Sequence, residues 1–246
     1  MGLKGKVKDF IEKRTNFRFY YNQVPFGIDP FEDIKMIWKG YRTNILFDVG
    51  SNEGQSVRDF LIFDKKASIY CFEPIKSTFE SLSSKFRHHN NVKTHMLALG
   101  SFEGVVKMKL SDSSCMNSIV SDSEDSSEEF VQENIQSKTL DNFCKENFIE
   151  HINYLKIDTE GYDLDVLKGA NRMLDSSKID FVQVEAGMNP QNNYHVPMQN
   201  LKTFLEDKGY YLFGIYDQKH EYIPVWRPYL RRCNMVFVAK DFYYSN

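Results

Sequence analysis

The sequence predicts an α/β fold built on a mostly parallel sheet, and three observations support this fold class. From residue 44 onward, short apolar runs alternate with segments in which apolar residues recur at helical spacing. The first runs are almost continuously apolar, which is typical of parallel strands that are covered on both faces. A turn from Gly50 to Gly54 joins the first run to a helix, as at the ligand-binding edge of doubly wound sheets.

The elements follow from these local patterns in chain order. Strands are predicted at residues 44–49, 68–72, 92–97, 152–157, 179–185, 210–215 and 233–239. Helices are predicted at residues 54–63, 76–87, 139–147, 162–174 and 197–208. The last two strands have no helix of convincing length between them, so we expect an antiparallel hairpin at the edge of a seven-stranded sheet.

The chain is expected to have two parts. Residues 1–43 predict an N-terminal helical extension, in which Asp29 and Pro30 begin a second helix. Residues 44–246 predict one domain. Within it, residues 111–137 are rich in serine and acidic side chains, which predicts a mobile surface loop that is either a lid or solvated surface.

The composition indicates a globular protein. Of the 246 residues, 41% are hydrophobic and 15% are aromatic, and the net charge of −3 argues against a dedicated nucleic-acid binder. The four cysteines are scattered without a Cys-x-x-Cys pair, so we expect a reduced, cytoplasmic chain. We see no signal peptide and no apolar run long enough for stable membrane insertion.

Two predicted strands end in an acidic residue near the glycine turn. Asp48 ends the first strand, and Glu73 ends the second. In nucleotide-binding α/β folds, an acid about 20 residues or more past a glycine turn holds a ribose diol. The sequence therefore predicts a nucleoside cofactor lying across adjacent strand ends.

Two further strands deliver acids to the same edge. Asp158 ends the fourth strand and Glu185 ends the fifth, where ligands bind in open α/β sheets. Glu160 and Asp163 flank the start of the next helix, so they either complement its dipole or take part in function. A buried acid at a strand end needs a partner, which favours a functional role for Asp158.

These motifs resemble those of FkbM-type methyltransferases. The resemblance rests on DVGSNEG at 48–54, FEP at 72–74 and KIDTEGY at 156–162, and on GIYD at 214–217 and NMVFV at 234–238. It covers roughly residues 44–240. It implies the Rossmann-like class I methyltransferase fold, S-adenosylmethionine as cofactor, and O-methylation of a hydroxyl, often on a sugar or a natural product.

The resemblance implies a set of cofactor-binding residues. The turn would approach the methionine part of the cofactor, Asp48 would face its amino group or a bound water, and Glu73 would take both ribose hydroxyls. Ala98 and Leu99 would lie against the adenine or would simply pack in the core. The full set is Asp48, Gly50, Ser51, Asn52, Gly54, Glu73, Pro74, Ala98, Leu99 and Asp158.

A sugar hydroxyl must lose its proton when it is methylated, so a base or a metal is expected near the acceptor. Asp158, Glu185 and His195 are the candidate catalytic residues, with His195 as the base because histidine titrates near neutrality. Alternatively, Asp158, Glu160, Glu185 and His195 hold a magnesium-type divalent metal through oxygen ligands. The sequence leaves both alternatives open.

We expect an S-adenosylmethionine-dependent O-methyltransferase whose acceptor is a sugar or glycan and not a nucleic acid. Aromatic and amide side chains near the predicted edge suit a sugar ring: Tyr162, Tyr194, Tyr216, Trp226, Asn189, Asn192 and Asn193. The alternatives are methylation of a non-sugar natural product, an oxidoreductase that binds NAD or a nucleotide-sugar, and a non-catalytic binding module. The Gly-x-x-x-Gly spacing speaks against the oxidoreductase.

Overall fold

The computed structural model describes residues 7, 10, 11, 14, 15, 24–109, 118–119, 132–192, 194–220 and 229–245. A seven-stranded sheet forms the centre, in the order β10-β11-β9-β8-β1-β2-β3. These strands are β1 (Ile45–Val49), β2 (Ser68–Phe72), β3 (Val92–His95), β8 (Ile152–Ile157), β9 (Ile179–Gly187), β10 (Tyr210–His220) and β11 (Leu230–Ala239).

Strands β1, β2, β3, β8 and β9 are parallel to one another, whereas β11 runs antiparallel to both β9 and β10. The predicted Rossmann-like class and its edge hairpin are therefore confirmed. Strand β11 inserts between β9 and β10, so the residues at its start lie at the same edge as the carboxyl ends of the parallel strands. This places the start of β11 beside the ends of β8 and β9.

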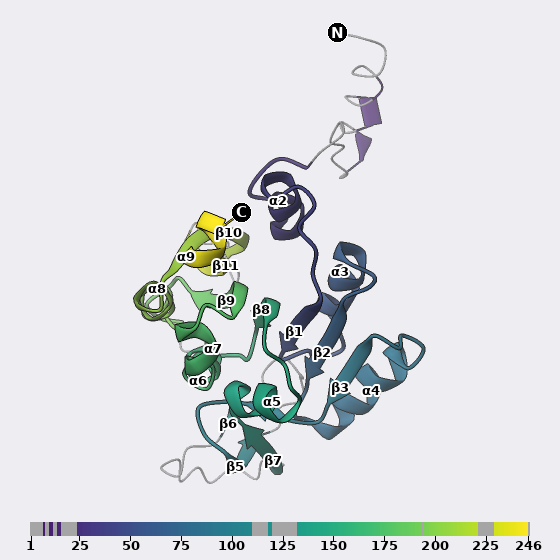
Figure 1. Ribbon diagram of the computed structural model, residues 1–246, viewed down its shortest axis with the longest axis vertical. Coiled ribbons are helices and arrows are strands. Elements are labelled where there is room, and N and C mark those ends of the chain that lie inside the picture. Colours follow the sequence, from purple (N-terminus) through teal and green to yellow (C-terminus); the bar gives the residue numbers. More distant parts are fainter. Residues whose placement is uncertain are drawn as a thin grey trace.

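Helices cover both faces of the sheet. They are α2 (Pro30–Ile37), α3 (Gln55–Phe63), α4 (Lys76–Phe86), α5 (Leu140–Glu146), α6 (Asp163–Lys168), α7 (Asn171–Asp175), α8 (Met198–Asp207) and α9 (Lys240–Ser245). Figure 1 shows α2 and α3 on one side of the strands and α5, α6 and α7 on the other. Two separate buried clusters match these two layers.

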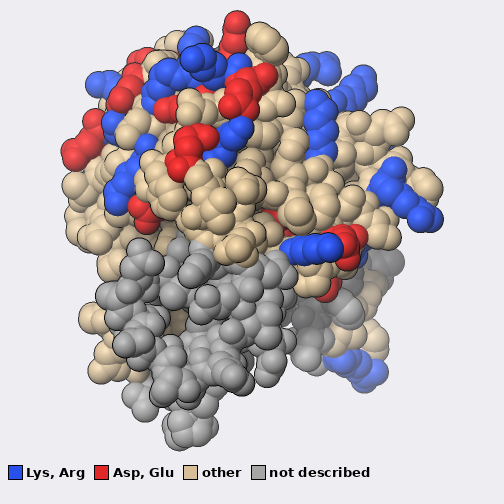
Figure 2. All heavy atoms as spheres, turned by 90° about the horizontal axis from the view of Figure 1, so that it is seen from below, with Lys and Arg blue, Asp and Glu red and all other residues tan. Residues whose placement is uncertain are grey.

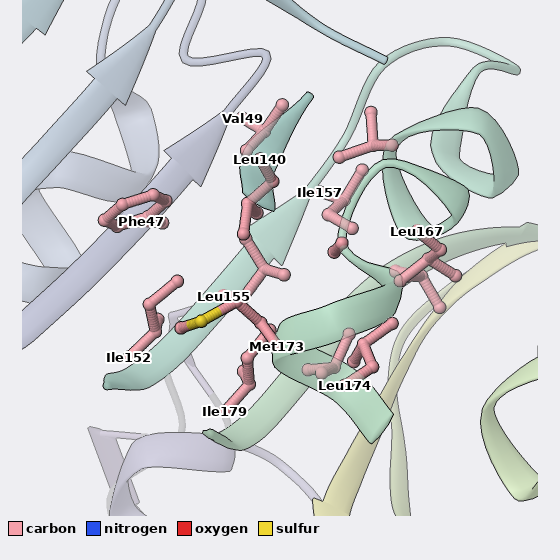
Figure 3. Packing of buried hydrophobic residues seen from close by; sticks show 14 of the residues in the cluster. Phe47, Val49, Leu140, Ile152, Leu155, Ile157, Leu167, Met173, Leu174 and Ile179 are labelled. Atoms are coloured by element: carbon pink, nitrogen blue, oxygen red, sulfur yellow. The ribbon is translucent and has the colours of Figure 1, made fainter. Parts of the chain in front are cut away.

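The larger cluster shows why the strands are apolar on both faces. Leu155 and Ile157 of β8 pack against apolar side chains of α5, α6 and α7, as Figure 3 shows around Leu140 and Leu167. Tyr154, whose side chain alternates with theirs, packs instead in the cluster with α2, α3 and α4. Such two-sided burial produces the nearly continuous apolar runs that the sequence shows.

A second, four-stranded sheet was not predicted. It contains β4 (Ala98–Leu99), β7 (Gln132–Lys138), β5 (Gly104–Lys109) and β6 (Ser118–Ile119), in that order. The strand predicted at 92–97 ends at His95, and the loop prediction is wrong for residues 118–119 and 132–137. Strand β7 is mostly polar, with Ile135 as its buried apolar side chain, so hydrophobic alternation did not indicate it. The rest of the predicted loop, 111–117 and 120–131, lies outside the described residues.

The predicted helix at 162–174 is two helices, α6 and α7. The break falls at Gly169, where an added Cβ would lie 1.9 Å from the carbonyl oxygen of Gly100. The backbone of the loop after β4 thus packs directly on this position. A helix carrying a side chain here would push that loop away from the domain.

Helix α2 is joined to the sheet by buried polar contacts. Asp29 caps its first turn, and the Asp33 carboxylate accepts hydrogen bonds from the Tyr216 hydroxyl and the Gly27 amide, both at 2.8 Å. The Tyr216 side chain is therefore buried against α2 and is not exposed at the ligand-binding edge, as we had expected from the sequence. The predicted domain boundary after residue 43 stays a prediction, and most of the first predicted helix lies outside the described residues.

The described surface carries both signs of charge. Figure 2 shows acidic and basic side chains interspersed on one face, in keeping with the small net charge. Among the described helices, none has the length and apolar character needed to cross a bilayer.

Replacing Leu155 by Ala tests the packing between β8 and the helices. Leu155 is fully buried in the central strand, so we expect the free energy of unfolding to fall by about 2–5 kcal/mol. The control is Ile62→Ala, because Ile62 is 76% exposed, and it should change stability by less than about 1 kcal/mol. Urea unfolding measures both. Equal losses in the two variants would contradict the assignment of this core.

Candidate active site

A cavity of about 450 Å³ lies at the carboxyl ends of the parallel strands. Strands β1, β2, β8, β9 and β11 all contribute to its wall, together with the turns that follow them. The lining residues are Val49, Gly50, Ser51, Asn52, Gln55, Ser56, Phe72, Glu73, Pro74, Ile75, Leu97, Ala98, Leu99, Lys156, Asp158, Thr159, Glu160, Tyr162, Glu185, Asp217, Arg232 and Asn234. Most of the predicted cofactor residues are among them.

The turn after β1 depends on Gly50. Its φ of +78° is in the left-handed region, and an added Cβ would lie 2.0 Å from the carbonyl oxygen of Asp158. The Gly50 and Ser51 amides both donate to the Phe72 carbonyl oxygen at 3.0 Å. The Gly50 turn thus contacts the ends of both β2 and β8, and it forms part of the cavity wall there.

Glu73 presents a buried carboxylate to the cavity. Its Oε2 accepts a hydrogen bond from the Asn52 amide and its Oε1 one from the Ile75 amide, both at 3.0 Å. Burial raises the pKa of Glu73. Since each carboxylate oxygen has two lone pairs, one on each oxygen is left for a ligand's hydroxyl groups. This is the arrangement that a ribose diol requires.

Lys156 is a buried cation between two carboxylates. Its Nζ donates to Asp158 Oδ2 at 3.1 Å and to Asp48 Oδ1 at 3.5 Å. Burial opposes the charged form of Lys156, but the two carboxylates outweigh it and raise its pKa. Burial likewise opposes ionisation of Asp158, yet Lys156 lowers the Asp158 pKa. Lys156 was not among the predicted site residues, although a lysine inside an apolar strand signals a buried partner.

Two predicted cofactor residues lie away from the cavity wall. Asp48 is fully buried beneath it, and burial raises the Asp48 pKa. Gly54 caps α3, and an added Cβ there would lie 2.3 Å from the Phe86 ring, so this glycine serves the packing of α4. Ala98 and Leu99 do line the cavity, and Leu99 also belongs to the core.

Glu160, Glu185 and His195 converge at the other end of the cavity. His195 Nε2 lies 2.7 Å from Glu185 Oε2 and 3.7 Å from Glu160 Oε2. The sequence predicted that this histidine would meet the acids of β8 and β9, although it is separated from Glu185 by a loop. The structure therefore brings Glu185 and His195 together, while Asp158 pairs with Lys156.

Both ring nitrogens of His195 have a close partner, Glu185 at Nε2 and Asn192 at Nδ1. Its Nε2 faces the Glu185 carboxylate as a donor, so in the neutral ring Nδ1 accepts from Asn192 Nδ2 at 2.9 Å. The side chain is only 4% exposed and is not part of the cavity wall. Burial lowers the His195 pKa. A role as the direct base, as we expected from the sequence, would need this ring to leave its partners.

Arg232 and Asn234 are lining residues that the sequence reasoning missed. Arg232 and Asn234 belong to the first half of β11, and Arg232 forms an ion pair with Oε1 of Glu185 in β9. Their position follows from the insertion of β11 between β9 and β10, which a hairpin prediction alone does not give. Arg232 thus neutralises Glu185 from the side opposite His195.

Glu160, Glu185 and His195 each offer a ligand atom, and these atoms lie within 4.8 Å of one another, as in a metal site. Asp158, the fourth predicted ligand, is not in this group. Both Glu185 oxygens already have partners, His195 and Arg232, and a cation on Glu185 would face the Arg232 guanidinium. This donor set therefore does not fit a divalent metal well, and we assign no step to one.

Asp163 has a structural role. Its carboxylate accepts hydrogen bonds from the Thr159 amide and hydroxyl and from the Glu185 amide. Burial raises the Asp163 pKa to about 7. Asp163 therefore braces the turn that carries Glu160 against β9 and does not reach the cavity.

A family model described as "Methyltransferase FkbM domain" matches residues 48–235. The chain belongs to this family. The match covers every element of the cavity wall, from the end of β1 to β11, so the resemblance seen in the motifs is confirmed.

Two curated proteins show sequence similarity to this FkbM domain. The hexuronic acid methyltransferase AglP of Haloferax volcanii is 28% identical over 150 residues, 61% of this chain and 59% of AglP. The 2-O-methyltransferase NoeI of Sinorhizobium fredii is 23% identical over 153 residues, 57% of this chain and 62% of NoeI. The matched region thus spans about three fifths of the length of each relative. Among solved structures, the METTL16 methyltransferase domain aligns at 10% identity with a TM-score of 0.48, over 85% of this chain and 64% of its own.

Gly50→Ala and Gly40→Ala together test the close approach in the β1 turn. Both glycines have φ near +80 to +90°, but an added Cβ meets no atom within 4 Å at Gly40. Backbone strain alone should cost each variant about 1–2 kcal/mol. The contact with the Asp158 carbonyl should cost Gly50→Ala about 1–3 kcal/mol more, measured by urea unfolding. Equal destabilisation of the two variants would contradict the tight junction of β1 and β8.

Proposed function

We propose that this FkbM domain is an S-adenosylmethionine-dependent O-methyltransferase that methylates a hydroxyl group of a sugar or glycan. The observation that carries the proposal is the polarity of one continuous cavity. One end presents the Gly50 turn and the Glu73 carboxylate, and the other end presents Glu160, Glu185 and Arg232. A nucleoside cofactor suits the first end, and a hydroxylated acceptor suits the second.

The residues at the first end fit S-adenosylmethionine. Gly50 brings backbone close to the ligand, Glu73 offers free lone pairs to the ribose hydroxyls, and Ala98 and Leu99 provide an apolar surface for the adenine. When bound, the cofactor supplies an electrophilic methyl group on a sulfonium sulfur. Asp158, fixed by Lys156, lies between the two ends of the cavity and contributes negative charge close to that group.

Carboxylates at the second end favour a hydroxyl as the methyl acceptor. A hydroxyl must give up its proton, and carboxylates are able to receive it. A carboxylate acceptor needs no base, and Glu160 and Glu185 would repel it. Arg232 does not offset this repulsion, because it is already paired with Glu185.

The names of the relatives and the lining residues support a sugar. AglP is named for a hexuronic acid and NoeI for a 2-O position. Tyr162 and Asn234 line the cavity and offer a ring face and an amide, which suit the apolar and polar parts of a sugar. Tyr194 is exposed outside the cavity wall, and Asn193 and Trp226 lie outside the described residues.

Glu73→Ala tests the cofactor end. We expect S-adenosylhomocysteine to bind the wild type and its affinity for Glu73→Ala to fall by about 1.5–3 kcal/mol, since hydrogen bonds to a charged group are lost. Glu80→Ala, at an exposed position of the neighbouring α4, is the matched control and should bind as the wild type does. Titration calorimetry measures all three. Binding of NAD in place of S-adenosylhomocysteine would support the oxidoreductase alternative and contradict the proposal.

A panel of acceptors tests the substrate class. The protein is incubated with methyl-labelled S-adenosylmethionine and, separately, with methyl glycosides of hexoses and hexuronic acids, with DNA, with RNA and with protein. We expect label in a glycoside, and we expect it to survive mild alkali, because a methyl ether is stable there and a methyl ester is not. Alkali-labile label would identify a carboxylate acceptor, and label in nucleic acid or protein alone would show that the substrate class is wrong.

A further inference from the structure

We propose that Glu160 is the catalytic base and that His195 is a positioning residue that acts through it. This inference rests on the proposed function and assigns the proton-accepting group within that site. It differs from the sequence-based expectation, in which His195 takes the proton directly.

Exposure to the cavity distinguishes the candidate bases. The Glu160 side chain is 34% exposed, whereas His195 and Glu185 are 4% and 3% exposed. Glu160 lines the cavity, and His195 does not. An acceptor hydroxyl can therefore approach the Glu160 carboxylate without displacing protein groups.

Hydrogen-bond occupancy leads to the same residue. Both Glu185 oxygens and both His195 ring nitrogens have close partners. Within the described part of the chain, the nearest ionic partner of the Glu160 carboxylate is His195 Nε2, at 3.7 Å, which is beyond hydrogen-bond distance. Glu160 keeps its lone pairs for a ligand.

Asp158 is equally exposed, at 32%, but it is a poorer base. Lys156 donates to it at 3.1 Å and lowers its pKa, so its carboxylate holds a proton weakly. Burial and the neighbouring Asp158 charge instead raise the pKa of Glu160. A base with a pKa closer to neutrality accepts a hydroxyl proton more effectively.

The backbone at Glu160 is unusual for its residue type. Its φ of +49° is in the left-handed region, which costs a non-glycine residue about 1–2 kcal/mol. Strained conformations of this kind persist where the surrounding structure holds them, often at functional sites. Asp163, which bonds Thr159 and the Glu185 amide, holds the turn in place.

The step balances as a displacement with proton transfer. A lone pair of the acceptor oxygen forms a bond to the methyl carbon as the carbon–sulfur bond breaks. The electron pair of the broken bond remains on sulfur, which becomes a neutral thioether. The hydroxyl proton moves to a Glu160 carboxylate oxygen. The positive charge of the sulfonium and the negative charge of Glu160 are both lost, so the net charge is unchanged.

The charged groups facing Glu160 set the pH dependence. These are Asp158 from the end of β8, His195 from the loop before α8, Glu185 from β9, and Arg231 and Arg232 from β11. Glu160 must be ionised to accept a proton, so turnover should fall as the pH drops through its raised pKa. His195 lowers the Glu160 pKa, so removing His195 should move this acid limb to higher pH.

The test compares Glu160→Gln with Glu80→Gln as the matched surface control. Affinity for S-adenosylhomocysteine is measured by calorimetry, and His195 is titrated by NMR in the protein without acceptor. Turnover is measured against pH with the methyl glycoside that the wild type methylates. For Glu160→Gln we expect affinity within twofold of wild type, and a lower His195 pKa because a nearby negative charge is gone. We also expect turnover to fall by about 100-fold or more. The remaining turnover should no longer decrease at low pH, because the titrating carboxylate is gone.

His195→Gln provides the second arm. It should retain more turnover than Glu160→Gln while its acid limb moves to higher pH, which a purely structural histidine would not cause. Glu160→Gln that keeps more than a third of wild-type turnover, an unchanged His195 titration, or a tenfold loss of S-adenosylhomocysteine affinity would each overturn the assignment of Glu160. A wild-type protein that binds no S-adenosylhomocysteine and methylates no glycoside would instead overturn the proposed function itself.

Discussion

The buried Lys156 cation is the interaction on which the site depends. It joins Asp48 of β1 to Asp158 at the end of β8, across the strand pair at the centre of the sheet. Removing one member of a buried ion pair typically costs about 3–5 kcal/mol, because the remaining charge is left without a partner. Lys156 lowers the pKa of Asp158 at the cavity wall, while Asp48 is fully buried beneath it.

The same pairing divides the work among the acids of the cavity. Lys156 keeps Asp158 ionised, and that fixed negative charge helps to raise the pKa of Glu160 two residues later. Arg232 and His195 occupy the two oxygens of Glu185, which leaves Glu160 as the acid that has no such partner among the described residues. Glu73, at the other end, accepts hydrogen bonds from the backbone amides of Asn52 and Ile75. In the function that we propose, the carboxylates of these residues would serve as cofactor ligand, electrostatic anchor, positioning group and base.

Most of the fold followed from local sequence patterns, because strands buried on both faces and turns with glycine leave clear signals. Strands β2 and β8 have the predicted limits, and the hairpin of β10 and β11 was predicted from the absence of a helix between them. Strand β7 was not predicted, since its polar residues pair through their backbone and bury little apolar surface. The break at Gly169 was also invisible, because it depends on contact with Gly100, which is distant in sequence.

The sequence indicates which residues lie at the ends of the strands, but it does not indicate which of their side chains form ion pairs with one another. In the structure, Glu73, Asp158 and Glu185 line one cavity, and His195 contacts Glu185. The pairing of Lys156 with Asp158 and of Arg232 with Glu185 joins residues on different strands or depends on the place of β11 in the sheet. Such pairings determine which carboxylates already have partners, and the sequence does not show this.

A crystal structure of the protein with S-adenosylhomocysteine is the most direct measurement of the central claim, that this cavity orients a nucleoside cofactor toward the carboxylates of β8 and β9. We expect both ribose hydroxyls on the Glu73 carboxylate, the adenine against Ala98 and Leu99, and the sulfur facing the space beside Glu160. A nucleoside bound elsewhere, or bound with its sulfur turned away from Glu160 and Glu185, would contradict the claim.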